Sequence, residues 1–328
     1  MSNLTQFGND LYTGKRSFDF IGKRKIWYGI ATVLMVISIA LPFIGGGFNF
    51  GIEFRGGSQF QVAGASTTEQ QIGIDAVHSI VPDDVTRVTT IGDDGVRVQT
   101  GQLDNDTTQE VAAALATAYD VDAAEVTSSF VGPSWGADIT GQAIRGLIVF
   151  IVLAAIVMAL YFRTWKMAAA ALVSLAHDLI IAAGVYAATG FEITPAAVIG
   201  FLTILGYSLY DTVVVFDKIR ENTSELGVES RSTFGEAVNL AVNQTLVRSI
   251  NTGVVAALPV AAILFIGSFI LGADTLRDIS LALLVGILVG TYSTIFIAAP
   301  LYAQLREGEK AIVESDRRAV VARERTVS

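Results

Sequence analysis

Long apolar runs alternate with short polar segments over most of the chain. A helix needs about 20 residues to cross a bilayer, and six runs approach or exceed that length. These runs are Ile26–Ile44, Ala143–Phe162, Met167–Thr189, Ile193–Phe216, Leu246–Ile270 and Ile279–Tyr302. The pattern predicts a polytopic α-helical membrane protein with six transmembrane helices.

Between the first two runs, the pattern changes to alternating strands and amphipathic helices. Strand-like segments at 58–64, 85–92, 95–101 and 124–132 surround helical spacing at 67–81 and 105–119. The resulting order, β-α-β-β-α-β, is that of a ferredoxin-like α+β domain. This fold hosts many functions, so it identifies none by itself.

Composition agrees with a membrane protein, because 52% of the residues are apolar and only 16% are charged. Lys and Arg gather before the first run, between the second and third, after the fourth and after the sixth. Short cytoplasmic loops collect these residues, so both termini are expected in the cytoplasm. The predicted division is a cytoplasmic segment (1–25), a first transmembrane helix (26–44), an extracytoplasmic α+β domain (45–142), five further helices (143–303) and a cytoplasmic tail (304–328).

The extracytoplasmic domain is strongly acidic. Residues 49–141 hold fourteen acidic side chains, three arginines and no lysine, which gives a net charge of −11. Such a surface repels nucleic acid. We interpret it as an adaptation to high salt, where charge repulsion is screened, and a cation-binding surface is the alternative.

Ionisable residues interrupt the apolar runs at a few positions. His177 and Asp178 lie midway along the third run, Asp211 in the fourth and Arg248 near the start of the fifth. In an antiparallel helix pair, Asp211 and Arg248 lie at similar depth and form either a structural salt bridge or a protonation switch. For His177 and Asp178, a structural hydrogen bond and a proton relay are both open.

Five motifs give the chain a family resemblance. They are GIEFRGG (Gly51–Gly57), GPSWG (Gly132–Gly136), GYSLYDTVVVFDKIREN (Gly206–Asn222), LVRSINTG (Leu246–Gly253) and GTYSTIFIAAPL (Gly290–Leu301). The first resembles the glycine-rich motif of the SecD/SecF protein-export family, and the other four are similar to its SecF member. The order and spacing hold over residues 45–303.

This resemblance implies half of an RND-type transporter fold that pairs with a SecD chain. It also implies a multi-pass protein of the cytoplasmic membrane that helps the Sec translocon channel to export unfolded polypeptides, driven by a proton or sodium gradient. A halophilic archaeon is the source we expect. No enzymatic activity, cofactor, metal or nucleic-acid partner is implied. A passive scaffold of the translocon and a small-solute RND exporter are the alternatives.

The same resemblance assigns site residues. Asp211 and Arg248 are the expected ion-coupling pair, and His177 and Asp178 the possible relay. The family-motif positions are Gly51, Glu53, Phe54, Gly56, Gly57, Gly206, Tyr207, Ser208, Asp217, Arg220, Glu221 and Asn222.

Overall fold

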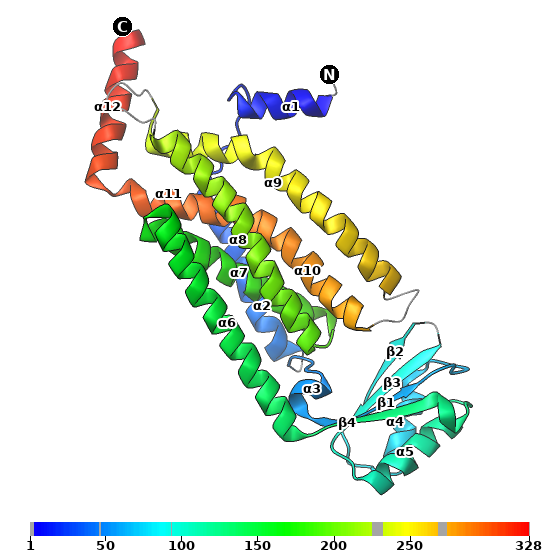
Figure 1. Ribbon diagram of the computed structural model, residues 1–328. Coiled ribbons are helices and arrows are strands. Elements are labelled where there is room, and N and C mark those ends of the chain that lie inside the picture. The colour runs from blue at the N-terminus through cyan, green and yellow to red at the C-terminus, as the bar shows by residue number, and fades with distance from the viewer. Residues whose placement is uncertain (1–2, 46, 93, 225–231, 268–273, 328) are drawn as a thin grey trace.

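A bundle of long helices and a small sheet domain make up the molecule (Figure 1). The computed structural model describes residues 3–45, 47–92, 94–224, 232–267 and 274–327. The sheet domain lies beyond one end of the bundle, and the N- and C-terminal helices lie at the other end. We call these two ends the sheet end and the terminal end.

Six helices in the described ranges are long and apolar enough to cross a membrane, which confirms the prediction. They are α2 (Arg24–Ile44), α6 (Pro133–Phe162), α7 (Trp165–Thr189), α8 (Pro195–Ser224), α9 (Phe234–Phe265) and α10 (Asp274–Ser293), the last continued by the π-helical turn η3 (Thr294–Ala298) and by α11 (Ala299–Glu307). The predicted end of the fifth run, at 268–270, lies outside the described residues.

Small residues let the central helices approach closely. On α10, a Cβ atom at Gly286 would collide with the Ile204 side chain of α8. One at Gly290 would lie 3.0 Å from the Cβ atom of Ser208. The G-x-x-x-G spacing of α10 therefore packs against α8, as small-residue pairs do between membrane helices.

The sheet domain has the predicted ferredoxin-like topology. Its elements are β1 (Gly57–Val62), α4 (Gln70–His78), β2 (Arg87–Ile91), β3 (Gly95–Thr100), α5 (Asn105–Ala118), the short helix η1 (Ala123–Glu125) and β4 (Val126–Val131). The strands are antiparallel in the order β2-β3-β1-β4.

The two faces of this sheet differ in polarity because strand side chains alternate. Phe60 and Val98 belong to the apolar core that includes Leu115 of α5. Gln59 and Arg97, on the opposite face, line a pocket with residues from the sheet end of the bundle. The polar face of the sheet is thus turned toward the membrane helices.

The bundle contains two apolar clusters. One, at the terminal end, includes Phe162, Phe216 and Tyr302. The other, at the sheet end, includes Tyr186 and Phe201. Along α7 and α8, the buried residues between these clusters are mainly polar.

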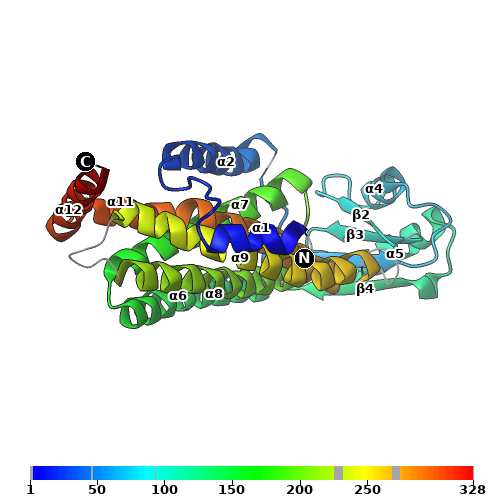
Figure 2. The ribbon, with the colours of Figure 1, turned by 90° about the horizontal axis from the view of Figure 1, so that it is seen from above.

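A short N-terminal segment is fastened to α9, and we call residues 12–21 the N-terminal strap. It follows α1 (Asn3–Tyr12), which lies across α9 in the view from above (Figure 2). The Oδ1 atom of Asn243 accepts the backbone N–H of Phe18 at 2.7 Å, and its Nδ2 donates to the carbonyl of the same residue at 2.9 Å. Asn239 accepts the N–H of Phe20 at 2.8 Å. Side-chain amides of α9 thus replace the backbone partners that a strand or helix would supply.

Candidate functional site

A layer of buried polar side chains crosses the middle of the bundle between the two apolar clusters. We call it the polar layer, and it draws on α7, α8, α9, α10 and η3. Its members are Ser174, His177, Asp178, Ser208, Asp211, Thr212, Ser249 and Thr294, together with the buried hydroxyl of the half-buried Tyr292. Ionisable groups inside a membrane are costly and commonly mark sites of ion or proton transfer.

Asp211 is the carboxylate at the α8–α9 contact in this layer. It is only 5% exposed, and its Oδ1 atom accepts a hydrogen bond from the Ser249 hydroxyl at 2.9 Å. Its Oδ2 atom is buried and has no hydrogen-bond partner among the described residues. One carboxylate oxygen is therefore fixed while the other keeps its capacity to take a proton or a cation.

Arg248 does not contact Asp211 as the sequence suggested. Its side chain is exposed, and the described residues show no ion pair between the two. Neighbouring helix positions are rotated by about 100°, so Ser249 faces α8 while Arg248 turns away from it. Arg248 instead lines a pocket of about 410 Å³ together with Tyr12, Lys218 and Glu221.

His177 and Asp178 form the second ionisable group of the layer. The Nδ1 atom of His177 lies 3.2 Å from Oδ1 of Asp178, and both side chains are almost fully buried. The other carboxylate oxygen, Oδ2, accepts the Ser208 hydroxyl of α8 at 2.6 Å. A hydrogen-bonded line therefore runs from α7 to the helix that carries Asp211.

Two further contacts tie this layer to the last membrane helix. The hydroxyls of Thr212 and Thr294 lie 3.0 Å apart and join α8 to η3. The imidazole of His177 lies 6.0 Å from the ring of Tyr292 on α10. Single π-helical turns within α-helices are frequent at functional sites, and this one begins at Thr294.

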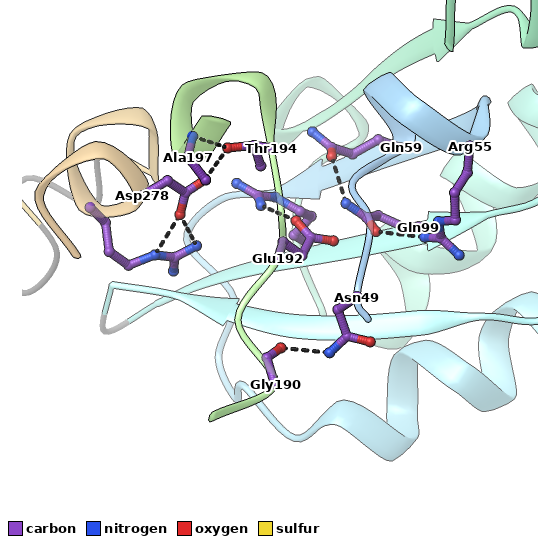
Figure 3. Close-up of polar contacts among 11 residues, drawn as sticks. Asn49, Arg55, Gln59, Gln99, Gly190, Glu192, Thr194, Ala197 and Asp278 are labelled. Atoms are coloured by element: carbon purple, nitrogen blue, oxygen red, sulfur yellow. Dashed lines mark hydrogen bonds and ion pairs between the residues drawn. The ribbon is translucent and has the colours of Figure 1, made fainter. Parts of the chain in front are cut away.

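At the sheet end, a second polar cluster joins the sheet domain to the bundle (Figure 3). The Arg97 guanidinium lies 3.2 Å from the carboxylate of Glu192, with both side chains about 10% exposed. Asn49 donates to the carbonyl of Gly190 at 2.6 Å, and Thr194 donates to Asp278 at 2.9 Å. The loop between α7 and α8 therefore holds both the sheet domain and α10.

Glu53 lies in this junction, on α3 (Ile52–Arg55), and lines a pocket of about 620 Å³. Burial raises the pKa of its carboxyl above the ordinary value because desolvation disfavours the charged form. Its own backbone N–H and Arg97 oppose this rise, and the negative charges of Glu192 and Asp278 add to it.

The glycines of the first motif shape the same junction. Gly56 and Gly57 have φ of 74° and 137°, values that L-residues with a side chain rarely adopt. A Cβ atom at Gly57 would also collide with the carbonyl of Thr100. Gly51 donates its N–H to the carbonyl of Ile193, and Phe54 packs with the sheet-end cluster. The motif thus builds a tight joint between α2 and the sheet.

The remaining motif residues lie along α8. Gly206 is exposed with open space where its Cβ would lie, and Tyr207 is half-buried. Beyond Asp211, Asp217 accepts the Tyr161 hydroxyl at 2.8 Å. Nearer the end of the helix, Glu221 pairs with Lys218, Asn222 donates to Gln244 of α9, and Arg220 is exposed.

Sequence reasoning missed three contributors: Ser249, Tyr292 and the Arg97–Glu192 pair. Ser249 was detectable, since it falls on the same helical face as Val242 and Leu246, whereas Arg248 does not. No group of three or more metal-binding side chains gathers in the parts of the chain that the structure describes.

Comparison with known proteins gives consistent relatives. A family model described as protein export membrane protein SecD/SecF, C-terminal, matches residues 110–308, and the SecD/SecF GG motif model matches residues 43–64. Protein translocase subunit SecF of Streptomyces coelicolor is 44% identical, over 98% of this chain and 86% of its own length. That of Mycobacterium leprae is 40% identical, over 95% and 69%.

Solved structures show the same likeness. The crystal structure of SecDF from Thermus thermophilus, described as a translocon-associated membrane protein, superposes with a TM-score of 0.77 at 28% identity. It covers 89% of this chain, which spans 39% of the SecDF chain. SecDF in a super-membrane-facing form superposes with a TM-score of 0.64.

Proposed function

The chain belongs to the SecD/SecF family of protein-export membrane proteins, and we propose from this premise that it assists Sec-dependent protein translocation as a SecF-type subunit. A SecD chain is the proposed partner, since the SecDF protein of Thermus thermophilus, a relative of this chain, carries both subunit names as a single polypeptide. The Sec translocon channel and unfolded exported polypeptides are the further partners in this proposal, and no enzymatic step is required.

The proposed location is the cytoplasmic membrane, with both termini in the cytoplasm and the sheet domain outside. The six membrane helices support a multi-span arrangement. The positions of Lys and Arg support the orientation. Because the relatives named above are bacterial, a halophilic archaeal source remains a prediction that rests on the acidic outer domain alone.

Asp211 is the ion-coupling residue in this proposal, and the observation that carries it is its buried oxygen, which has no hydrogen-bond partner in the described part of the chain. A proton or sodium ion on this oxygen removes a negative charge from the α8–α9 contact. Two packing states that differ in their affinity for the ion are then populated differently as the ion binds and leaves. A gradient across the membrane thereby drives a cycle of movement.

For Arg248 we propose a role other than the direct pairing with Asp211 that the sequence suggested. Its exposed guanidinium lies in the 410 Å³ pocket at the terminal end, one residue away from Ser249. We propose that it adjusts the electrostatic potential along the ion route from that pocket, without pairing directly with Asp211.

The test is export of a reporter protein in cells that carry Asp211→Asn, with the SecD partner co-purified to check assembly. Lost export with intact assembly supports the ion-coupling role. Normal export, or loss of assembly together with export, favours the passive scaffold. Asp138→Asn is the matched control, because it removes the same charge from an exposed position near the start of α6.

A small-solute exporter is the remaining alternative. The 620 Å³ pocket at the sheet end is large enough for a small molecule, but six of its ten lining residues are polar and three of those are charged. Drug-sized ligands prefer predominantly apolar pockets. Unchanged export in a strain that lacks this chain, together with greater sensitivity to small toxic compounds, would favour the exporter.

A further inference from the structure

The polar layer contains a second ionisable centre that the proposed role of Asp211 does not use. His177 and Asp178 are each 2% exposed, midway along a membrane helix. Removing such groups from water is costly, and a hydrophobic pair would pack at this position at lower cost. A purely structural bond therefore explains the contact but not the choice of two titratable groups.

This centre keeps unused hydrogen-bonding capacity. The Nε2 atom of His177 is buried and has no hydrogen-bond partner among the described residues, and the same holds for the Ser174 and Tyr292 hydroxyls. The Nδ1 atom, by contrast, is held by Asp178. One ring nitrogen is thus oriented by a carboxylate while the other remains available to take or give a proton.

Ser208 links this centre to the helix of Asp211. Its hydroxyl donates to Asp178 at 2.6 Å, the shorter of the two hydrogen bonds to that carboxylate. Ser208 precedes Asp211 by three residues, so the two lie on one face of α8 about 4.5 Å apart along its axis. A change of charge at Asp211 therefore acts on Asp178 through a short, rigid element.

Three tyrosines on the helices packed against α7 have charged neighbours of their own. Tyr28 of α2 has Arg24 and Glu307 as its charged neighbours. Tyr161 of α6 donates to Asp217, and the Tyr302 hydroxyl of α11 accepts from Arg306. Tyr292 of α10 faces the imidazole with its ring. Asp211 is thus the acidic group of the polar layer to which the centre can respond.

We propose that His177, Asp178 and Ser208 form a second proton-binding station that exchanges with Asp211 during the transport cycle. The station is a carboxylate beside a neutral imidazole in one state, with a net charge of −1. It gains one proton, on Asp178 or on His177, in the other state and becomes net neutral. When Asp211 is protonated, the station releases its proton, and when Asp211 is ionised, the station takes one up.

This inference rests on the ion-coupling role proposed for Asp211, and a spectroscopic readout separates the two. His78 and His177 are the two histidines of the chain, so His78→Gln leaves a single imidazole. We would label the full-length His78→Gln chain with ¹⁵N-histidine, reconstitute it in lipid bilayers, and follow the His177 nitrogen shifts by solid-state NMR from pH 5 to pH 9.

The expected result is a His177 titration that depends on both carboxylates. Asp178→Asn displaces its midpoint by about 1 pH unit or more, since it removes a charge at hydrogen-bond distance. Asp211→Asn displaces the midpoint by a smaller but measurable amount, and Asp138→Asn leaves it unchanged. A His177 spectrum that is identical in the parent and the Asp211→Asn chain over the whole pH range would overturn the proposal.

A second measurement uses export in cells and a matched pair of serines. Ser208→Ala, which cuts the link from α8 to Asp178, is expected to lower export several-fold with the SecD partner still bound. Ser293→Ala is the control, because Ser293 is equally buried but donates to the backbone carbonyl of Gly290. Equal export by the two variants would contradict the relay.

The failures of the two proposals differ. If Asp211→Asn abolishes export but leaves the His177 spectrum unchanged, the ion-coupling role stands and the second station is wrong. If Asp211→Asn exports normally, the ion-coupling role is wrong, and the relay that depends on it fails with it.

Discussion

At the scale of single residues, the Ser249 hydroxyl decides how Asp211 is held. We expect Ser249→Ala to destabilise the chain by about 1–3 kcal/mol, because the buried carboxylate loses its partner. Export should slow as well. Thermal unfolding of the purified chain and reporter export are the two measurements.

Thr245→Val is the control for that change. Thr245 lies one helical turn earlier on the same buried face, but its hydroxyl donates to the backbone carbonyl of Ala241. Its loss therefore leaves Asp211 untouched. If the two variants slow export equally, Ser249 has no special role.

The raised pKa of Glu53 predicts that the stability of the protein depends on pH. Burial raises its folded pKa above the ordinary 4.5, so the folded state binds this proton more tightly than the unfolded state does. Its contribution to stability is full below the unfolded pKa and declines as the pH rises through the folded pKa. Glu53→Gln should remove this decline and raise the melting temperature at neutral pH relative to the parent.

The measurement is thermal unfolding of both proteins at pH values from 4 to 8. The difference in melting temperature between the two proteins should shrink as the pH falls toward the pKa of Glu53 in the unfolded state. A gap that grows on acidification would mean that the Glu53 pKa is lowered, against the burial described above.

The sequence indicated ionisable residues that lie buried inside the bundle, and it was less informative about which residues touch. Asp211 stood out because a charge in an apolar run has few explanations. Its partner was assigned by charge to Arg248, although helical periodicity favours Ser249. Attraction between opposite charges predicts proximity, but the rotation of the helix decides which side chain faces the neighbour.

At the scale of elements, the contact between α8 and α10 depends on glycines, which have no side chain to hold the helices apart. We expect Gly286→Ala to destabilise the bundle by about 1–3 kcal/mol, because its Cβ atom collides with Ile204 and pushes the helices apart. Gly206→Ala should be neutral or stabilising by about 0.5–1 kcal/mol, because it meets open space and favours the helix.

Thermal unfolding of the two alanine variants tests this prediction. Comparable melting temperatures would mean that the helices adjust to a methyl group at either position and that the close packing is not required.

The elements themselves were largely predictable. Period-two and helical spacing between the first two membrane helices led to the correct β-α-β-β-α-β order, because that domain is built from short amphipathic pieces. The π-helical turn at Thr294–Ala298 gave no such signal. One extra residue in a turn changes the hydrogen bonding of the backbone without changing the apolar composition.

At the scale of the whole molecule, Arg97 and Glu192 connect parts that lie far apart in the sequence. We expect Arg97→Gln to destabilise the junction by about 3–5 kcal/mol, because it leaves Glu192 largely buried without its ionic partner. Hydrogen–deuterium exchange in the loop at residues 190–194 should rise.

The double variant Arg97→Gln, Glu192→Gln tests whether the effect comes from the pair. It should lose less stability than the sum of the two single variants, because no unpaired charge remains. Strict additivity would show that the two side chains act independently. No pattern in the sequence predicted this pair, since neither residue lies in a recognised motif.

The N-terminal strap constrains the order in which the chain completes its folding. Phe18 is bonded to Asn243, a partner 225 residues further along the chain. A ribosome makes the strap among the first residues, but the amides that hold it emerge only when α9 is synthesised. Contacts of such long sequence separation form late. Closure of the strap is therefore a late step in the biogenesis of the bundle, and until then the backbone N–H groups of Phe18 and Phe20 lack their partners on α9 and the segment stays open to chaperones and proteases.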